Sequence, residues 1–414
     1  MATANAIEAA RLMLRLRTGE DQAQVYARLA ELGPVHVMPW KAVVVTGYEL
    51  CREVLGDPSY ATLDAGWRDR LSPGWRANRS LVTFHTSLIA MKPPQHTALR
   101  KVLTSELSPQ AVAALRPRVA AAIDHALEEL ATMLAGGSTV DLVAGLAATL
   151  PIEILCIWLG LSTEDAARLA RITRRWSVAY EIGPSPAELA DADEAHGMLC
   201  DYLLPHLERR RHTPGDDTLS RWLMPAPHGG GLDIPTVLAS TALAFLGAKD
   251  LTSLTTSAVH ALLTDPTLPG RLRQDATAAV EDIARLSPAI AVLVRVATRD
   301  MLLGGVAVEA GSLVHTLLQP ANRDPSRGNS ILSFGTGIHY CAAASLNRLT
   351  LQLLLPLMAD RFPALRLAST LPKSEGVVFP HLARLLASEQ PGAAAALCPH
   401  QRTTKADSPV PWKA

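Results

Sequence analysis

A cysteine towards the end of the chain has the surroundings of a metal ligand. Cys341 ends the segment Phe334 to Cys341, FGTGIHYC, and apolar helical spacing begins directly after it. Gly335 and Gly337 permit a tight bend that brings the backbone close to a flat ligand. A thiolate at a helix entrance gains from the helix dipole and from unpaired backbone N–H groups, which lower the pKa of the thiol. Taken alone, such a cysteine is more often a small buried hydrophobe, so its neighbours must decide.

The residues before Cys341 form a specific pattern. The order Phe, Gly, x, Gly, x, His, x, Cys resembles the heme-binding loop of the cytochrome P450 family. The resemblance implies a heme b cofactor (iron protoporphyrin IX), with Cys341 as axial ligand to iron, His339 at a heme propionate and Phe334 beside the sulfur. Gly335 and Ala343 would lie where the backbone nears the heme, and Ala343 replaces a glycine that is common in the family. Thiolate donation to iron favours O–O cleavage.

Three cationic side chains extend the resemblance. His96 and Arg100 lie one turn apart in PPQHTALRK, on one face of a predicted helix. By resemblance both reach the heme propionates, and Arg295 in LVRVAT is a third propionate partner. An arginine fork suits a carboxylate bidentately, which gives the assignment a physical basis. Singly, these residues are equally explained by a solvated basic patch and an exposed strand arginine; together with Cys341 they favour the heme site.

The elements that must position these residues are mostly predicted helices. HTALRKVLTSEL, SPQAVAALRPRVAAAIDHALEELATMLA and STEDAARLARITRRWSVAYE have apolar residues at three- and four-residue steps, and serine opens the last two as a cap. The segment from Ile234 to Leu263 forms one long helix, apolar on all sides and therefore internal. A further helix is predicted for Asp275 to Leu286. The final helix follows Cys341 and ends near Arg361.

Short strands and one long connection complete the pattern. VHVMPWKAVVVTGYEL carries two β-rich runs around a turn at Pro39 to Lys41, which predicts a small N-terminal sheet. AIAVLVRVAT and MLLGGVAVEAGSLVHTLL are also typical of strands, the second with a Gly-Gly turn. The segment from Ala61 to Pro94 is rich in glycine and proline and predicts an irregular connection of the kind that forms ligand lids.

The expected architecture is mainly α with small β-sheets, an α+β fold of the cytochrome P450 type. A chain of 414 residues, 48% of them hydrophobic, can bury an extensive core. We expect one domain over residues 1–389, with a β-rich part at about 30–60 and a helical heme-binding part at about 94–362. Residues 390–414, rich in alanine and proline and polar at the end, predict a disordered tail.

Charge and cysteine content narrow the partners and the compartment. The 39 Lys and Arg balance 39 Asp and Glu, so no net field attracts nucleic acid or an anionic membrane, and a neutral small molecule is the expected partner. Five scattered cysteines without CxxC pairs favour a reducing cytoplasm. The N-terminus lacks the pattern of a secretory signal. The most apolar segment, Leu142 to Leu161, is interrupted by Pro151 and Glu153 and predicts a buried helix rather than a membrane span.

The long internal helix departs from the family at its most reactive point. Relatives carry an acid followed by a threonine there, which relay protons during oxygen activation; in FLGAKDLTS the two positions hold Lys249 and Asp250. Gly247 keeps the small residue that lets a ligand approach the helix. Asp250 could take over proton delivery, or Thr252 could if the helix register is shifted. A structural ion pair or a lost relay is the alternative for the charged pair.

A second departure concerns the acid–arginine network behind the cysteine loop. The family's Glu-x-x-Arg pair corresponds to Asp282 and Arg285, three residues apart on one helix face, with an ordinary surface ion pair as the alternative. Glu281 is a neighbouring substitute that would face elsewhere. Only residues 326–333 separate ANRDP from Phe334, a loop shorter than the family's by roughly a dozen residues. That loop normally supplies a second arginine, for which Arg327 is the candidate substitute.

The leading interpretation is a heme-thiolate monooxygenase of the soluble bacterial class. Oxygen and electrons from a ferredoxin and its reductase would oxidise an apolar C–H or C=C bond in a pocket between Ala61 to Pro94, the long helix and the strand near Val292. Leu243 and Val292 are predicted to line the pocket, with core packing as the alternative for each. Abundant alanine and arginine are typical of GC-rich bacterial genomes, and natural-product tailoring, including antibiotic biosynthesis, follows by analogy.

Two other interpretations stay open. Because Lys249 and Asp250 replace the usual relay, the enzyme could perform peroxide-driven, coupling, rearrangement or dehydration chemistry on heme. Alternatively, the shortened loop resembles that of heme-poor relatives which stabilise a glycosyltransferase as a biosynthetic partner protein. Cys341 argues against the second alternative, since such helpers typically lack the ligand.

Overall fold

A computed structural model describes residues 4–16, 22–181, 183–225, 231–370, 376–380 and 382–389. The predicted tail from residue 390 onward lies outside the described residues. Every structural statement below concerns the described part of the chain.

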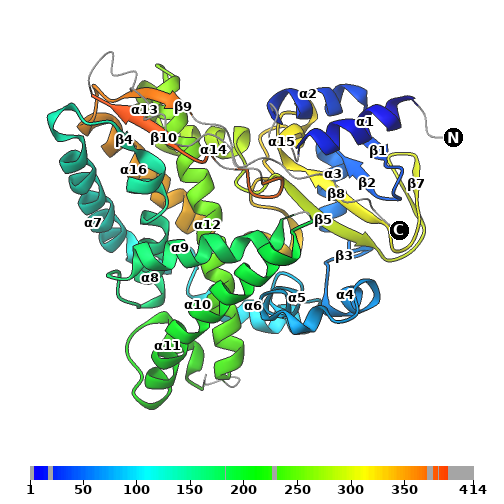
Figure 1. Ribbon diagram of the computed structural model, residues 1–414, viewed down its shortest axis with the longest axis horizontal. Coiled ribbons are helices and arrows are strands. Elements are labelled where there is room, and N and C mark those ends of the chain that lie inside the picture. The colour runs from blue at the N-terminus through cyan, green and yellow to red at the C-terminus, as the bar shows by residue number, and fades with distance from the viewer. Residues whose placement is uncertain are drawn as a thin grey trace.

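Helices make up most of this part, and one of them, the long helix α12, runs through the helical half of the molecule (Figure 1). The helices are α1 (Ala4–Arg15), α2 (Gln22–Leu32), α3 (Tyr48–Gly56), α4 (Ala65–Leu71), α5 (Arg79–Thr86), α6 (Gln95–Ser105), α7 (Pro109–Leu134), α8 (Leu150–Leu159), α9 (Ala166–Ser177), α10 (Pro186–His212), α11 (Thr218–Leu223), α12 (Ile234–Thr264), α13 (Leu268–Gln274), α14 (Ala276–Leu286), α15 (Leu318–Ala321) and α16 (Ala344–Arg361).

The strands form three small sheets. The largest has the order β1-β2-β8-β5-β3, in which β2 and β8 run parallel and the other neighbours antiparallel. The second has the order β4-β10-β9, and β6 pairs with β7 alone. The strands are β1 (Val35–Val37), β2 (Val43–Val45), β3 (Tyr60–Ala61), β4 (Val140–Asp141), β5 (Val292–Ala297), β6 (Met301–Leu303), β7 (Val306–Val308), β8 (Leu313–Leu317), β9 (Arg366–Thr370) and β10 (Leu385–Ser388).

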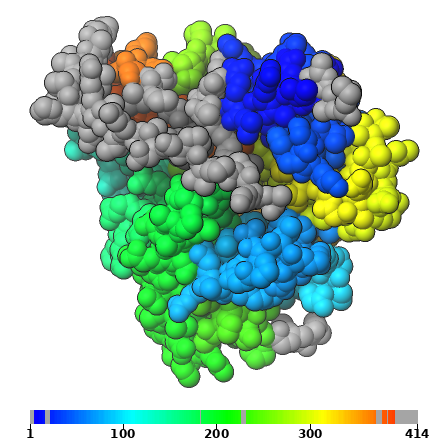
Figure 2. Space-filling model, turned by 45° about the vertical axis from the view of Figure 1, so that its right-hand side comes forward, coloured from blue at the N-terminus to red at the C-terminus, as the bar shows by residue number. Residues whose placement is uncertain are grey.

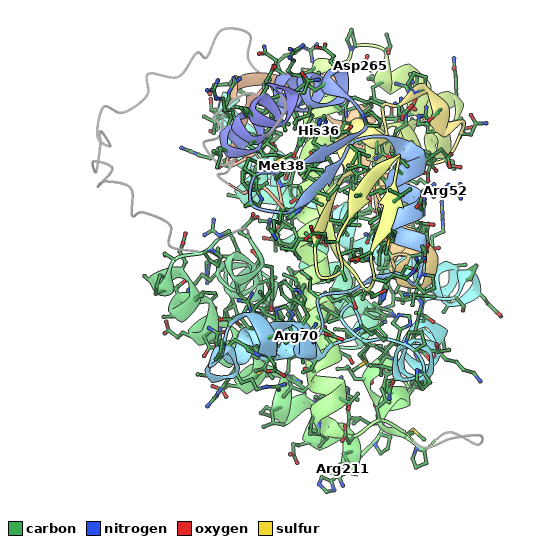
Figure 3. The ribbon with its side chains drawn as sticks, turned by 90° about the vertical axis from the view of Figure 1, so that its right-hand side faces the viewer. His36, Met38, Arg52, Arg70, Arg211 and Asp265 are labelled. Atoms are coloured by element: carbon green, nitrogen blue, oxygen red, sulfur yellow. The ribbon has the colours of Figure 1, made fainter. Side chains whose placement is uncertain are left out.

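The large sheet joins segments that lie far apart in the chain. Val43 to Val45 pair with Val314 to Thr316, so the predicted N-terminal sheet is completed by strands from residues 292–317. Figure 2 shows the N-terminal segment, in blue, against the yellow segment that carries these later strands. In Figure 3, His36 and Met38 lie on this sheet region, while Asp265, directly after α12, and Arg211, near the end of α10, lie at opposite ends of the view.

Helix α12 is the centre of the largest hydrophobic core. It begins at Ile234 because the Asp233 carboxylate accepts the Thr236 N–H, and Pro235 needs no N–H at that position. Its residues pack with those of α8, α9, α10 and α16. By length and composition α12 could span a membrane, but 61% of its most apolar window is buried inside the protein. Helix α12 is therefore a core helix, as the sequence predicts.

Two further apolar clusters cover the faces of the large sheet. Helices α1 and α2 pack on one face, against Val44, Val292 and Leu317, and α3 packs on the other, against Val43 and Val314. The Gly-Gly turn between β6 and β7 is confirmed: Gly304 and Gly305 have φ of 56° and 81°, as a two-residue hairpin requires. The mainly α architecture with small sheets is thus confirmed.

The expectation of an irregular connection over Ala61 to Pro94 is wrong. That segment contains α4, α5 and a short 3-10 turn between them. The Asp64 and Asn78 side chains accept the backbone N–H groups of Trp67 and Leu81 at 2.8 and 3.0 Å, so side-chain caps stabilise helices too short to show apolar periodicity.

One predicted cap is also wrong. Ser108 caps α7 as expected, accepting the Ala111 N–H, but Ser162 does not cap α9. The Ser162 hydroxyl accepts the Glu164 N–H in a local turn, and the helix begins only after Asp165. The serine thus satisfies the backbone two residues ahead instead of starting the helix.

Candidate functional site

The loop before α16 is a tight bend that holds Cys341 inside the protein. Gly335 and Gly337 both have φ of 69°, a left-handed conformation that favours glycine. A Cβ atom on Gly337 would lie 3.3 Å from the Gly56 Cα atom at the end of α3, so the loop packs there without room for a side chain. The Cys341 N–H donates to the Phe334 carbonyl at 2.8 Å and closes the loop.

The Cys341 sulfur lies at the start of α16, as the sequence predicts, but its thiol is not acidic. Helix α16 begins at Ala344, and the Ala343 N–H donates to the sulfur. That hydrogen bond and the charges of Arg100 and Arg348 lower the pKa of Cys341, yet burial outweighs them and raises it to about 11. The expected lowering of the pKa is therefore wrong for the protein alone. Thiolate formation would depend on a bound metal ion, which deprotonates a coordinating thiol.

Four basic side chains meet beside this loop. The ring centroids of His96 and His339 are 4.5 Å apart, joining α6 to the loop. The Arg100 Nη2 donates to the Tyr340 carbonyl at 2.6 Å and makes a second link. Arg295 on β5 acts on the same place, because its charge lowers the pKa of His339. The structure thus brings together the basic residues that the sequence assigns to one site.

Among the described residues, two of these side chains, His96 and Arg295, are buried without the partners that buried polar groups require. His96 is 1% exposed, yet neither ring nitrogen has a hydrogen-bond partner in the described chain. Arg295 is 8% exposed and, among the described residues, donates one hydrogen bond, to the Val294 carbonyl at 3.0 Å, and forms no ion pair. Burial lowers the pKa of Arg295 to about 10, and burial together with Arg295 lowers that of His339 to about 3. A buried cluster of this kind is incomplete without an anion.

Helix α12 has open space beside Gly247. Gly247 on α12 is exposed, and a Cβ atom built on it would meet no atom within 4 Å in the described structure. Asp250, one turn further along, acts on Cys341, since its charge raises the pKa of that thiol. The residues fit heme: a thiol for iron, four basic groups for two propionates, and a glycine that leaves open space beside the long helix.

The three residues considered for proton delivery have different surroundings. The Asp250 Oδ1 atom is buried without a hydrogen-bond partner among the described residues. Burial raises the pKa of Asp250 and lowers that of Lys249, and each charge partly offsets the effect on the other. Lys249 is 7% exposed, and its Nζ atom lies 4.8 Å from the Phe379 ring centroid. The Thr252 hydroxyl donates to the Ala248 carbonyl at 3.3 Å.

The acid–arginine network forms with a different second arginine. Asp282 and Arg285 pair at 3.1 Å as predicted, and Arg271 of α13 pairs with Asp282 at 2.5 Å. Arg327, the predicted substitute, instead donates to the Ser330 carbonyl at 3.4 Å, so that hypothesis is wrong. Arg271 was missed because it precedes the acid, on a helix whose packing against α14 the sequence spacing does not reveal.

Glu281 also has a partner of its own. As the sequence suggests, it faces away from the Asp282 pair, and it accepts hydrogen bonds from Arg348 of α16. The Arg348 guanidinium lies over the Phe334 ring, 4.2 Å from its centroid, and donates to the Tyr340 hydroxyl at 3.0 Å. Glu281 therefore positions Arg348, which packs on the cysteine loop. The resemblance to the family's cysteine loop did not indicate this contact.

The shortened loop is fastened by a polar residue of the ANRDP motif. The buried Asn322 side chain donates to the Ser333 hydroxyl at 2.8 Å and accepts the Leu332 N–H at 2.7 Å. The Ser333 hydroxyl in turn donates to the Ala284 carbonyl at 2.6 Å, near the end of α14. These contacts position the start of the cysteine loop despite its reduced length.

The predicted pocket residues differ in their surroundings. Leu243 is half-buried on α12, one turn before Gly247. Val292 is buried in the core between the large sheet and α1–α2, with Leu317 and Val377, which matches its alternative of core packing.

Sequence reasoning also missed Glu181, which acts electrostatically on Lys249 and binds the backbone of residues 377–379. It lies outside every recognised motif.

Comparison with known proteins agrees with this site. No protein-family model matches the chain. The chain is 30% identical over 377 residues to cytochrome P450 107B1 of Saccharopolyspora erythraea, covering 85% of this chain and 90% of that protein. It is 30% identical over 364 residues to the mycinamicin IV hydroxylase/epoxidase of Micromonospora griseorubida, covering 83% and 88%. The structure of the tirandamycin C-bound P450 monooxygenase TamI is similar with a TM-score of 0.76 at 29% identity, covering 89% of this chain and 98% of that one. The chain belongs to the cytochrome P450 family.

Proposed function

We propose that this protein is a heme-thiolate monooxygenase that oxidises an apolar small molecule in bacterial secondary metabolism. The observation that carries the proposal is the cluster of His96, Arg100, Arg295 and His339 beside the Cys341 loop, in which His96 and Arg295 are buried and no described carboxylate forms an ion pair with the arginines. Heme b is a planar ligand with two carboxylates and an iron atom. The carboxylates would pair with the basic cluster, and the iron would bind the Cys341 sulfur.

Each residue of the site has a definite task in this proposal. When bound, heme would supply the oxidation itself, in which dioxygen, two electrons and two protons yield one oxygen atom in the substrate and one molecule of water. Cys341 holds the iron, with the Ala343 N–H donating to its sulfur. The basic cluster neutralises and orients the propionates. Gly247 keeps α12 from blocking the space above the loop.

Asp250 is the proposed proton donor. Its pKa is raised by burial, so the carboxyl group can hold a proton near neutral pH, and its Oδ1 atom has no hydrogen-bond partner among the described residues. Thr252 donates to its own helix backbone, which makes its hydroxyl the weaker candidate.

Partners and compartment follow from the family. We propose a ferredoxin and its reductase as electron donors, and a cytoplasmic location, supported by four free cysteines among the described residues. Relatives named for mycinamicin IV and tirandamycin C support a natural-product substrate. We propose that the chain functions as one domain over residues 1–389.

The reduced, carbon monoxide-bound spectrum of the purified protein tests the proposal. We expect a far-red-shifted Soret band that is lost in Cys341→Ala and kept in Cys200→Ala, a matched control because Cys200 is a half-buried thiol whose pKa burial also raises to about 11. Heme-supplemented native protein without the shifted band would contradict the proposal and revive the heme-poor helper.

A second experiment separates monooxygenation from other heme chemistry, which the Lys249 and Asp250 replacement favours as the alternative. We expect product containing one oxygen atom from labelled dioxygen when ferredoxin and reductase are supplied. Product formed only with added peroxide, or without oxygen incorporation, would support the peroxide-driven or rearrangement alternative.

A further inference from the structure

A carboxylate from the connection between α9 and α10 is held by backbone N–H groups from near the end of the described chain. Glu181 follows the 3-10 turn Val178–Tyr180. Its Oε2 atom accepts the N–H groups of Val377 and Val378 at 2.9 Å each, and its Oε1 atom accepts that of Phe379 at 3.1 Å. Three donors on one carboxylate form a strong, charge-assisted contact between segments almost 200 residues apart.

The segment that receives Glu181 is shaped for it and anchored to the rest of the protein. A Cβ atom on Gly376 would lie 2.6 Å from the Glu181 Oε1 atom, so only glycine leaves room for the carboxylate. The Ala291 N–H, directly before β5, donates to the Val378 carbonyl at 2.9 Å. Residues 376–380 therefore bind the Glu181 carboxylate beside the large sheet, and we call this segment the carboxylate seat.

Lys249 of α12 supplies the positive charge at this seat. Its Nζ atom lies 4.8 Å from the Phe379 ring centroid, a cation–π distance. Burial lowers the pKa of Lys249, and the charges of Asp250 and, to a smaller extent, Glu181 raise it, so Lys249 and Glu181 lie within electrostatic reach of one another. A buried ammonium group needs anionic or aromatic neighbours, and Lys249 has both at the seat.

Lys249 and Asp250 therefore serve different surroundings although they are consecutive. Successive residues on an α-helix point about 100° apart, which follows from 3.6 residues per turn. Lys249 reaches Phe379 and Glu181, whereas Asp250 acts on Cys341. Lys249, at the position of the family's acid, thus contacts the carboxylate seat. Asp250, at the next position, acts on the Cys341 site.

The part of the molecule that Glu181 fastens also carries α5. The Asn78 side chain donates to the Leu189 carbonyl at 3.1 Å, the Ser80 N–H donates to Asp193 at 2.8 Å, and the Thr83 hydroxyl lies 2.9 Å from the His196 Nε2 atom. Figure 2 shows this light-blue segment against the green segment of α10. Helices α5 and α10 are thus linked as one cover.

We propose that Lys249 is a positioning residue that holds this cover closed. Its charge balances the Glu181 carboxylate where that group binds the carboxylate seat. Lys249 thereby sets substrate affinity and does not deliver protons. The proposal rests on the proposed function only in taking the cover as a wall of the substrate pocket. The closing contact itself is independent of heme chemistry.

Hydrogen exchange of the holoprotein tests the contact without turnover. We expect Lys249→Met to speed the exchange of the Val377, Val378 and Phe379 amides about tenfold, the size of a coupled local contact, and Glu181→Gln to do the same. Lys249→Arg should restore protection, and the exposed Lys41→Met is the control. Unchanged exchange in both Lys249→Met and Glu181→Gln would overturn the proposal.

Substrate titration and product yield then separate positioning from proton delivery. We expect Lys249→Met to weaken substrate binding, and to raise KM, about tenfold while the yield of product per electron falls by less than about twofold at saturating substrate. Asp250→Asn should show the opposite split. A Lys249→Met protein with native KM and poor product yield would assign Lys249 to proton delivery instead. Because the exchange experiment needs no activity, failure of the monooxygenase proposal would leave its result interpretable.

Discussion

Two buried arginines, in two regions of the molecule, have opposite surroundings. Arg210, near the end of α10, is 6% exposed and donates to the Asp217 carboxylate at 2.8 Å and to the Gly160 carbonyl. Arg295 on β5 is 8% exposed, and its one hydrogen bond among the described residues goes to the Val294 carbonyl. Arg210 therefore has its anionic partner within the described chain, whereas Arg295 needs an anion that the described residues do not supply.

The same contrast separates the site from its cover. The buried Lys249 and the half-buried Glu181 have charges and backbone donors that match, but His96 and His339 meet each other and two arginines, all basic. Folding tolerates a buried charge only when something balances it. A buried polar cluster that the chain leaves unbalanced is thus evidence for a ligand, and a balanced one is evidence for a structural contact.

Replacing the two arginines should give opposite results, and these are the largest effects we expect. Arg295→Met removes the unbalanced charge, so we expect heme affinity to fall about 100-fold, with no loss of stability in the heme-free protein. Heme titration and denaturant unfolding of the heme-free protein measure the two quantities.

Arg210→Met is the matched control. It strands Asp217, so the free energy of unfolding should fall by about 3–5 kcal/mol, while the folded protein binds heme as tightly as before. A heme-free Arg295→Met protein destabilised as much as Arg210→Met would mean that Arg295 is a structural residue, and the comparison would fail.

The sequence predicts the elements of this protein better than their pairings. Residues 234–263 and the last helix follow from apolar spacing, and the Gly-Gly turn follows from composition. Helices α4 and α5 do not, because they are too short for periodicity and depend on single side-chain caps. Likewise, nothing local indicates that β8 pairs with β2, since sheet order is decided by packing.

Within the site, the sequence predicts which residue types are present better than it predicts their burial and their charge partners. The cysteine loop and its basic residues follow from the resemblance, and the structure brings them together. The rise in the pKa of Cys341 does not, because burial is a property of the fold. Arg271 and Glu181 were missed for the same reason: each finds its partner through packing of distant segments.

His315 is a residue that could break the comparison, because its Nδ1 atom is buried in the middle of the large sheet and has no hydrogen-bond partner among the described residues. Burial lowers its pKa to about 4, so it stays neutral and needs no anion. Since the folded pKa lies below the ordinary value of about 6.5, its contribution to stability is present above pH 6.5 and is lost as the pH falls towards 4, by up to about 3 kcal/mol.

We expect His315→Leu to remove this part of the acid sensitivity in unfolding measurements between pH 6.5 and 4, and to leave heme affinity unchanged. The exposed His125→Leu should keep the native pH profile. If His315→Leu lowered heme affinity, an unpaired imidazole nitrogen outside the basic cluster would also mark a ligand site. The comparison would then have to include neutral groups as well as charged ones.

His96 should behave as a smaller version of Arg295. Replacing its unpaired ring by phenylalanine removes one hydrogen bond to a propionate, so we expect heme affinity to fall about tenfold and the heme-free protein to gain about 1 kcal/mol. His36→Phe is the matched control, because its buried ring already has a partner, the Leu29 carbonyl at 3.0 Å. That variant should lose about 1 kcal/mol of stability and keep its heme affinity. Equal heme losses in both variants would remove His96 from the site.

Thr252→Ala should have the smallest effect, because the Thr252 hydroxyl already donates to the Ala248 carbonyl of its own helix. A hydroxyl committed to its backbone adds little to a proton path, so we expect the product yield per electron to fall by less than about twofold, against about tenfold or more for Asp250→Asn. Thr264→Ala is the control, since that hydroxyl makes the same contact, to the His260 carbonyl, at the far end of α12. A loss in Thr252→Ala as large as in Asp250→Asn would show that the threonine takes part in proton delivery. An unpaired buried atom such as Asp250 Oδ1 would then identify functional residues of α12 less well than it does for the two arginines.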